Sequence, residues 1–272
     1  MSLRKSWTIS GRSHLEVTLT AGCPMMCSYC PQDNYIKGYK SINQTSKKLM
    51  SLEDYKIILN NVDYRVKQIH FTGFTESLAH PQWDSFIEHT RAKNYKAVVN
   101  TTLYNATFEK IDRLIDLDIM VRIHLTDSNI NVSKDMIAYF ISKYKRKADF
   151  KYFTEKGQSL LPEETDIKRK HARARGRRPQ SRGGNLKHIP SKIIKGPVRC
   201  RRNSFYRGNV VIPNGDVAVC CSDFSLKYIL GNLLNQKLID IHKSEPIKNF
   251  FNKMKSGDEK FICNNCVFAE KI

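Results

Sequence analysis

The side chains most able to do chemistry in this sequence are its cysteines, which fall into two groups. The first group is Cys23, Cys27 and Cys30, with the spacing C-x3-C-x2-C, in a loop that also contains Gly22 and Pro24. Three close thiolates suit an iron–sulfur cluster, and a [4Fe-4S] cluster held by three cysteines leaves one iron free to bind another ligand. Zinc would need a fourth nitrogen or sulfur ligand. A zinc knob or a set of buried thiols is the alternative interpretation.

The second group of cysteines lies far along the chain and brackets one small unit of structure. Its members are Cys200, Cys220, Cys221, Cys263 and Cys266, and the last two have the C-x2-C spacing that is common in metal sites. Four thiolates are enough to ligate an iron–sulfur cluster completely. A structural zinc ion is the alternative metal.

The composition is that of a globular, basic protein. The 272 residues include 46 Lys or Arg and 26 Asp or Glu, which gives a net charge of +20, and 40% of them are hydrophobic. No stretch approaches the roughly 18–20 apolar residues that cross a bilayer, and residues 1–11 lack the apolar core of a signal peptide. We therefore expect a soluble, cytoplasmic protein without membrane contact. In that reducing compartment its cysteines should bind metal rather than form disulfides.

Short β-branched runs alternate with helical patterns as far as residue 153. This alternation predicts repeated βα units and a mainly parallel sheet, hence an α/β fold. The expected strands are 15–20, 68–72, 96–101, 119–125 and 149–153. Between them, apolar residues at helical spacing predict helices whose buried stripes belong to the core. The expected helices follow Ser51, Pro81, Thr107 and Ser133.

The pattern changes near Lys145. Between residues 165 and 187, nine Lys or Arg accompany one acidic residue, and glycines and a proline interrupt any periodicity, so a basic loop is expected. An Asn-Gly turn at 213–216 then predicts a β-hairpin, and an apolar helical face follows that Pro246 divides into two helices. We place a domain boundary at about residue 190, between a unit at 1–190 and a smaller α+β unit at 191–272.

The first cysteine motif has a known counterpart. The run Ala-Gly-Cys-Pro-Met-Met-Cys-Ser-Tyr-Cys at residues 21–30 resembles the signature of the radical S-adenosylmethionine (SAM) enzymes, including the aromatic Tyr29 before the third cysteine. The resemblance implies that SAM chelates the open iron and that its reductive cleavage gives a 5'-deoxyadenosyl radical, which abstracts a substrate hydrogen. It also implies a partial (β/α)6 TIM-like barrel and a reductant such as flavodoxin or ferredoxin.

Further matches fall at the ends of the later predicted strands. The residues that the resemblance places at SAM are Tyr29, Gly73, Thr75, Glu76, Asn100 and His124. The sequence departs from the family pattern at Thr75, where a second glycine is common, and at Ser77, where a proline is common. An ordinary turn is the alternative for this segment. For His124 the alternative is a barrel histidine whose hydrogen bonds are all made within the protein.

The second cysteine group also has a counterpart. Residues 196–268 resemble the C-terminal domain called SPASM, or its shortened form called twitch. Full SPASM domains carry further cysteines after the C-x2-C pair and bind two auxiliary clusters, whereas this sequence has none after Cys266. The resemblance therefore implies one auxiliary [4Fe-4S] cluster. Its ligands would be Cys200, Cys220, Cys263 and Cys266, with Cys221 left as a small buried residue.

The basic segment contains one candidate catalytic residue. Residues 181–186 resemble a Ser-Arg-Ala-Gly-Asn segment of SPASM and twitch proteins, in which Arg182 would hold a SAM or substrate carboxylate or help to deprotonate a hydroxyl. A surface arginine is the alternative. The denser basic run at 168–178 would attract a polyanion such as nucleic acid, an acidic peptide or a phosphorylated metabolite, or would be a solvated loop.

Three hypotheses for function follow. The first is a radical SAM oxidoreductase in which the auxiliary cluster accepts an electron while a small hydroxylated or amino metabolite is dehydrogenated. This logic is similar to that of a radical SAM alcohol dehydrogenase with one SAM cluster and one twitch cluster. The second is radical modification of a peptide, a nucleotide or a nucleic acid docked on the basic segment. The third is a non-catalytic zinc and nucleic-acid binding protein.

Overall fold

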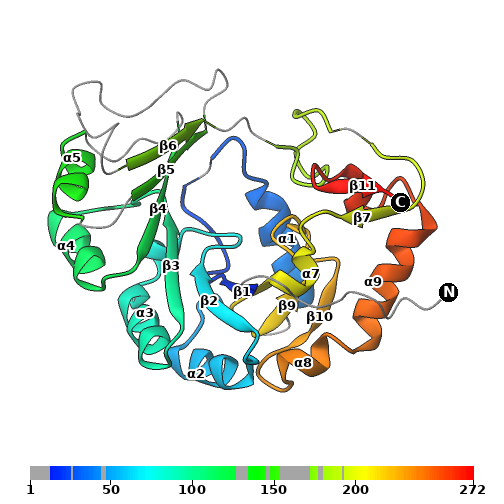
Figure 1. The fold of residues 1–272 in the computed structure, drawn as a ribbon, viewed down its shortest axis with the longest axis horizontal. Coiled ribbons are helices and arrows are strands. Elements are labelled where there is room, and N and C mark those ends of the chain that lie inside the picture. Colours follow the sequence, from blue (N-terminus) through cyan, green and yellow to red (C-terminus); the bar gives the residue numbers. More distant parts are fainter. Residues whose placement is uncertain are drawn as a thin grey trace.

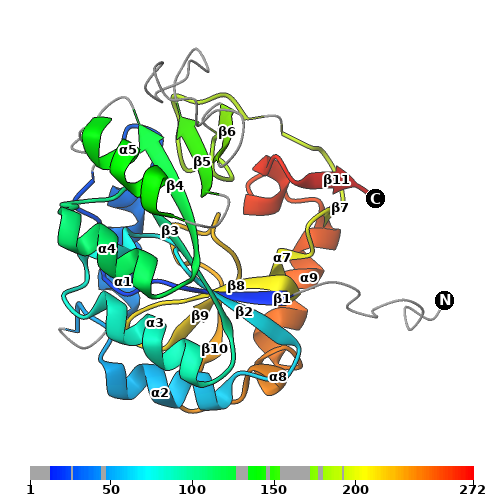
Figure 2. The ribbon, with the colours of Figure 1, turned by 60° about the vertical axis from the view of Figure 1, so that its left-hand side comes forward.

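The computed structural model describes residues 13–25, 27–43, 47–126, 134–144, 148–153, 172–176, 180–191 and 193–272. Six parallel strands form most of one curved sheet (Figures 1 and 2). In chain order they are β1 (Ser13–Val17), β2 (Val66–Phe71), β3 (Lys96–Thr101), β4 (Met120–Thr126), β5 (Ala148–Phe153) and β6 (Ala172–Gly176). The predicted α/β class and partial barrel are confirmed.

Helices cover the outer side of this sheet, along the left and lower edges of Figure 1. They are α2 (Leu52–Asn61), α3 (Trp83–Ala92), α4 (Phe108–Asp116) and α5 (Lys134–Lys143). Two of the predicted starts carry side-chain caps, since the hydroxyl of Ser51 accepts from the N–H of Asp54 and that of Thr107 accepts from the N–H of Lys110. The predicted apolar stripes of these helices lie in one core with the outward residues of the strands.

The two faces of the strands have different chemistry. Outward residues such as Leu15 and Val121 are buried against the helices. The alternate residues face inward, because side chains of a strand alternate between its two faces, and several of them are polar. The register pairs Glu16 with His70 and Asn100 with Arg122, so these polar residues form rows across the inner face.

The sheet continues beyond the predicted boundary at residue 190. Strand β8 (Gly208–Val211) pairs in parallel with β1, and β9 (Asp216–Ala218) and β10 (Ile229–Asn232) follow in antiparallel order. The β8–β9 pair is the predicted hairpin. At its turn Gly215 has φ +86°, and a Cβ there would lie 2.6 Å from Leu234 Cγ, so glycine is required. The boundary itself stays a prediction.

The remaining C-terminal elements form a smaller layer on the other side of the molecule. Strands β7 (Val198–Cys200) and β11 (Ala269–Lys271) pair in antiparallel order, close to the short helix α7 (Ser204–Arg207). Helices α8 (Leu238–Ile241) and α9 (Glu245–Ser256) are the predicted pair, and Pro246 lies in the first turn of α9, where a missing N–H costs nothing. No helix in the described ranges is long and apolar enough to span a membrane.

Two elements differ from the expectations. Strand β6 occupies part of the segment 165–187 that was expected to be a loop, because pairing with β5 supplies backbone hydrogen bonds that local sequence does not reveal. Residues 165–171 and 177–179 of that segment lie outside the described residues. Helix α1 (Gln32–Ile42) was not expected, since it lacks a long apolar stripe. It buries Tyr35 and Tyr39 instead, and the Tyr35 ring stacks on Phe74 with centroids 4.9 Å apart.

Candidate functional site

The first cysteine group lies in a loop that follows β1 and leads into α1. Cys27 is buried, and it packs with Tyr29 against Cys23 and Cys30 in one small cluster. The N–H of Cys30 donates to the carbonyl of Cys27 at 2.9 Å, which closes a tight turn between two of the thiols. The loop is therefore short, folded on itself and lined with sulfur on one side.

Gln32, which sequence analysis did not single out, organises this loop. Its side-chain carbonyl accepts from the N–H of Cys23 at 3.2 Å, and its amide N–H donates to Cys30 Sγ at 3.6 Å and to the carbonyl of Phe74. A donor aimed at a sulfur ligand orients it and tunes the metal. The buried position of Gln32, directly after the cysteine motif, is the signal that could have identified it.

The loop opens onto a cavity of about 380 Å³, called the central cavity below. Every residue that the sequence placed at the radical site borders it. These residues are Cys23, Cys27, Cys30, Tyr29, Gly73, Thr75, Glu76, Asn100, His124 and Arg182. The parallel strands explain this convergence, because the carboxyl ends of β1 to β4 meet at one edge of the sheet.

Two features of the segment after β2 suit a bound ligand. Gly73 has φ +92°, and a Cβ there would lie 2.2 Å from Thr18 Oγ1, so only glycine fits this turn. Thr75 Oγ1 is buried yet has no hydrogen-bond partner among the described residues. A buried hydroxyl without a partner costs free energy, and a ligand in the central cavity would supply the partner.

The carboxylate of Glu76 accepts its hydrogen bonds from the protein itself. Its buried carboxylate accepts from the N–H of Leu78, from the Thr101 hydroxyl at 2.6 Å, and from the N–H and hydroxyl of Thr102 at 2.7 and 2.8 Å. Four donors use about all the lone-pair positions of a carboxylate. Glu76 thus ties the loop after β2 to the end of β3, and its direct contact with SAM stays a prediction.

The inner face of the sheet adds polar residues that sequence analysis missed. His14 and His70 stack with ring centroids 4.1 Å apart, and His14 Nε2 lies 3.5 Å from Glu16 Oε1. Arg122 borders the same cavity. Alternating polar and apolar letters in β1 (SHLEV) and β4 (MVRIHLT) were the available signal, because a barrel strand turns every second residue inward.

Arg182 reaches the central cavity from the segment before the second cysteine group. It adopts φ +51°, and its guanidinium carbon lies 6.0 Å from the Phe224 ring centroid. The turn is fixed by the Asn185 side chain, which donates to the carbonyl of Arg182 at 2.6 Å, and by the N–H of Leu186, which donates to the carbonyl of Ser181. A left-handed residue held in this way points to a defined role for its side chain.

The second cysteine group borders a smaller cavity of about 40 Å³, called the auxiliary cavity below. Its four predicted ligands come together there from β7, from the segment after β9 and from the short 3-10 helix Ile262–Asn265 with the residue that follows it. They are Cys200, Cys220, Cys263 and Cys266, and Cys221 joins them on the wall. The β7–β11 ladder brings Cys200 beside the C-x2-C pair, pairing it with Ala269.

Cys221 and Arg202 border both cavities. They form the part of the wall that the central and auxiliary cavities share. The prediction that Cys221 is only a small buried residue stays open, because Cys221 borders both cavities.

Burial keeps the thiols of both groups protonated as long as no cation is bound. Burial raises the pKa of Cys23 to about 12, and it also raises the pKa of Cys220 and of Cys263. Such thiols stay neutral unless a cation replaces the proton, so metal binding would release protons. Among the described residues, no three His, Cys, Asp or Glu side chains converge on a single-ion position. The central cavity, lined by the three cysteines of the first group together with Cys221, and the auxiliary cavity, lined by the five cysteines of the second group, fit two iron–sulfur clusters, and the orphaned Thr75 hydroxyl fits SAM.

Comparison with protein families places this chain in a class. Residues 17–170 match the model of the radical SAM superfamily, and residues 200–267 match that of SPASM, an iron–sulfur cluster-binding domain. The first match covers more than half of the chain, which therefore belongs to the radical SAM superfamily and carries a C-terminal SPASM domain. It is a radical SAM enzyme, with a SAM-binding [4Fe-4S] cluster and SPASM auxiliary iron–sulfur binding. No curated protein matches its sequence.

Solved structures give particular relatives of the fold. The chain is similar to BtrN in complex with AdoMet and 2-DOIA, with a TM-score of 0.60 and 18% identity over 96% of this chain and 94% of BtrN. It is also similar to anSMEcpe with AdoMet and the Cp18Cys peptide, with a TM-score of 0.57 and 15% identity over 93% and 86% of the two chains. SuiB of Streptococcus suis, bound to its precursor peptide SuiA, gives a TM-score of 0.51 and 12% identity over 94% and 71%. These likenesses establish the fold.

Proposed function

We propose that this enzyme is an oxidoreductase that dehydrogenates a small hydroxylated or amino metabolite. When bound, SAM and the cluster at Cys23, Cys27 and Cys30 would supply a 5'-deoxyadenosyl radical that removes a hydrogen atom from the substrate. The single observation that supports oxidation is the shared wall between the two cavities. A substrate radical in the central cavity would lie beside a fully ligated auxiliary [4Fe-4S] cluster, the acceptor for its second electron.

The chain's own residues would hold the substrate and move its proton. Arg182 on the cavity wall would bind a carboxylate or lower the pKa of a substrate hydroxyl by its charge. Glu16 borders the same cavity beside His14, and its carboxylate would accept the proton that leaves when a C–H and an O–H or N–H are converted to a double bond. Thr75, Asn100, His124 and Tyr29 would contact SAM.

The limited space of the central cavity favours a small substrate over a peptide. Its volume of about 380 Å³ would have to accommodate SAM as well as the substrate. The chain also covers nearly all of BtrN, a structure that holds a small ligand, but only 71% of the longer SuiB, which holds a peptide. Modification of a peptide or nucleotide is the second candidate, supported by the peptides named for the SuiB and anSMEcpe structures.

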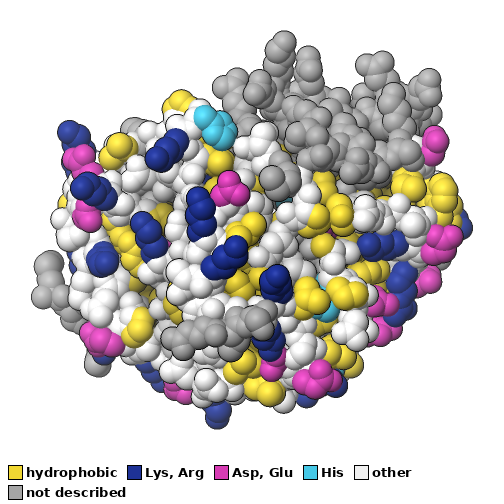
Figure 3. All heavy atoms as spheres, turned by 180° about the vertical axis from the view of Figure 1, so that it is seen from behind, with side chains coloured by type: hydrophobic (Ala, Val, Ile, Leu, Met, Phe, Trp, Pro, Cys, Tyr) yellow, Lys and Arg dark blue, Asp and Glu magenta, His cyan; other side chains and the backbone are white. Residues whose placement is uncertain are grey.

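Docking of nucleic acid on the basic segment has weaker support. Most of the run 168–178 lies outside the described residues. On the face opposite to that of Figure 1, Lys and Arg side chains lie interspersed with apolar and neutral surface (Figure 3). The non-catalytic zinc hypothesis is set aside, because the chain belongs to an enzyme superfamily.

Anaerobic reconstitution with iron, sulfide, reductant and SAM tests this proposal. Two [4Fe-4S] clusters correspond to about eight irons per chain, and 5'-deoxyadenosine should form. Changing Cys23, Cys27 and Cys30 to Ala should leave about four irons and abolish nucleoside formation. Bound zinc with little iron, or nucleoside formation that survives the triple change, would overturn the proposal. Candidate alcohols and amines that raise the rate of nucleoside formation then identify the substrate class.

A further inference from the structure

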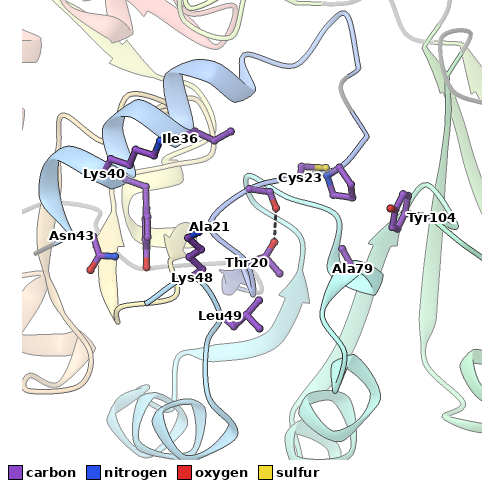
Figure 4. Close-up of a pocket in the computed structure, with 13 residues that line it drawn as sticks. Thr20, Ala21, Cys23, Ile36, Lys40, Asn43, Lys48, Leu49, Ala79 and Tyr104 are labelled. Carbon is purple, nitrogen blue, oxygen red and sulfur yellow. Dashed lines mark hydrogen bonds between the residues drawn. The ribbon is translucent and has the colours of Figure 1, made fainter. Parts of the chain in front are cut away.

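A second, larger hollow lies on the outer side of the cysteine loop. It has a volume of about 770 Å³ and is called the outer pocket below. Its walls are the loop before Cys23, the exposed side of α1, the segment at Lys48 and Leu49, and Tyr104. In Figure 4, Lys40, Asn43 and Lys48 lie together on one side of the pocket, and Cys23 and Tyr104 lie on the other.

Cys23 connects this pocket with the active site. It borders both the outer pocket and the central cavity, whereas Cys27 and Cys30 border the central cavity but are absent from the lining of the outer pocket. Of the three proposed ligands of the SAM cluster, Cys23 is thus the one that a molecule in the outer pocket can approach from outside. A group bound there would reach the cluster without entering the space of SAM or substrate.

The rim of the outer pocket is positively charged. Lys40 and Lys48 are exposed, and neither has an ion pair within the described part of the chain. The neighbouring Lys47 differs, since its ammonium pairs with Asp54. No acidic side chain is among the described residues that line the pocket. Leu49 is 44% exposed beside these cations, so the rim combines an apolar contact with uncompensated positive charge.

The pocket walls are held in place by the fold. The N–H of Ala21 donates to the carbonyl of Lys48 at 2.8 Å, and the N–H of Met50 donates to the carbonyl of Leu19 at 3.0 Å. The Tyr35 hydroxyl of α1 donates to the carbonyl of Thr20 at 3.1 Å. These bonds join the cysteine loop, α1 and the Lys48 segment into one preformed surface, which lowers the entropy cost of binding a partner.

We propose that the outer pocket is the docking site of an acidic one-electron carrier protein, which reduces the SAM cluster through Cys23. This inference rests on the proposed function, because reductive cleavage of SAM needs one electron from outside the chain. In the step, the reduced carrier loses one electron and the cluster gains it, with no bond made and no proton moved. Complementary charge favours such a carrier: an acidic surface around its prosthetic group would meet Lys40 and Lys48, while an apolar edge would contact Leu49.

The test uses reduced flavodoxin as the probe and charge reversal at the rim. The variant Lys40→Glu/Lys48→Glu is compared with Lys56→Glu/Lys93→Glu, which makes the same charge change at exposed positions outside the outer pocket. Calorimetry at low salt should show at least about tenfold weaker flavodoxin binding for the rim variant, and about wild-type binding for the control. Binding to the wild-type enzyme should weaken as salt rises.

Activity with two reductants separates docking from catalysis. With flavodoxin below saturation, the rim variant should form 5'-deoxyadenosine about tenfold more slowly, whereas with dithionite, a small reductant that needs no docking surface, its rate should equal that of wild type. Equal losses in the rim and control variants, or no loss in either, would refute the docking site. A slower dithionite rate in the rim variant would also count against it. Absence of nucleoside with dithionite in wild type would instead overturn the proposed function.

Discussion

The guanidinium carbon of Arg202 lies 3.6 Å from the ring centroid of Phe268, whose backbone N–H donates to Cys266 Sγ at 3.5 Å. The ring thus holds a positive charge beside a proposed ligand of the auxiliary cluster. The same arginine borders the central cavity. A nearby cation stabilises the reduced, more negative state of a cluster, so Arg202 should make the auxiliary site a better electron acceptor.

The first prediction concerns the midpoint potential of the auxiliary cluster. Arg202→Gln should lower the midpoint potential of the auxiliary cluster by about 30–60 mV, which is roughly a three- to tenfold change in its reduction equilibrium for one electron. A redox titration followed by electron paramagnetic resonance measures it, in the background that lacks Cys23, Cys27 and Cys30.

Arg201 provides the matched control for this measurement. Arg201 directly follows Cys200, beside Arg202 in the sequence. Its guanidinium lies 3.9 Å from Glu270, and it borders neither cavity. Arg201→Gln should leave the potential within a few millivolts of wild type. Equal shifts in the two variants would show that the potential depends only on the overall charge of the protein and not on the position of Arg202.

The ligand set of the auxiliary cluster gives a second prediction. Cys220→Ala should remove the cluster, because it deletes a ligand that the fold brings beside Cys200, Cys263 and Cys266. Cys221→Ala should retain about four irons in the background without the first cluster. Iron and sulfide analysis of both variants checks this, and loss of iron in Cys221→Ala would make Cys221 a ligand.

The unpartnered hydroxyl of Thr75 gives a third prediction. Thr75→Val should weaken SAM binding about fivefold, the loss expected for one hydrogen bond worth about 1 kcal/mol. It should not lower the free energy of unfolding without SAM, because the hydroxyl has no described partner there. Ser77→Ala is the control: Ser77 Oγ is also buried and unpartnered in the described structure, but it does not border the central cavity. Calorimetric titration with SAM should show a higher Kd for SAM in Thr75→Val and an unchanged Kd in Ser77→Ala.

Gly73 gives a fourth prediction. Gly73→Ala should lower the free energy of unfolding by about 2–3 kcal/mol, because its φ is +92° and the new Cβ would overlap Thr18 Oγ1. Gly22→Ala, in the loop before Cys23, is the comparison, since its Cβ would meet nothing closer than 4.0 Å. Denaturant unfolding of both variants measures the difference, and similar losses would show that the turn after β2 can relax.

Features set by neighbouring residues could be predicted from the sequence, and features set by distant ones could not. The cysteine spacings, the strand at Lys96–Thr101 and the helix caps at Ser51 and Thr107 each depend on a few adjacent residues. The stacking of His14 on His70 depends on the register of two strands, which the local sequence does not determine.

The same reason explains the errors at α1 and β6. Helix α1 is stabilised by contacts of Tyr35 and Gly38 with loops near residues 74 and 225, so its own sequence carries little signal. Strand β6 is basic and contains a glycine, and it becomes a strand by pairing with β5. Tertiary context overrides local propensity in both cases.

The last prediction concerns pH and His242, at the end of α8. Its Nε2 lies 2.8 Å from Asn209 Oδ1 of β8. Burial, together with the smaller effect of nearby Arg65, lowers the pKa of His242 to about 4 although Asp63 opposes the shift. The unfolded chain, with an ordinary histidine pKa near 6.5, therefore takes up a proton at a higher pH than the folded chain does. Stability from this group is complete above about pH 6.5 and is lost as the pH falls toward 4.

His242→Gln isolates this effect, because glutamine can still donate to Asn209 but does not titrate. Between pH 7.5 and 5.5 the wild type should lose roughly 1 kcal/mol more unfolding free energy than the variant. Denaturant unfolding at both pH values measures this, and the comparison cancels the acid sensitivity of the cysteine sites that the two proteins share. An equal loss in both proteins would mean that His242 is charged in the folded state, and that the contact between α8 and β8 tolerates the proton.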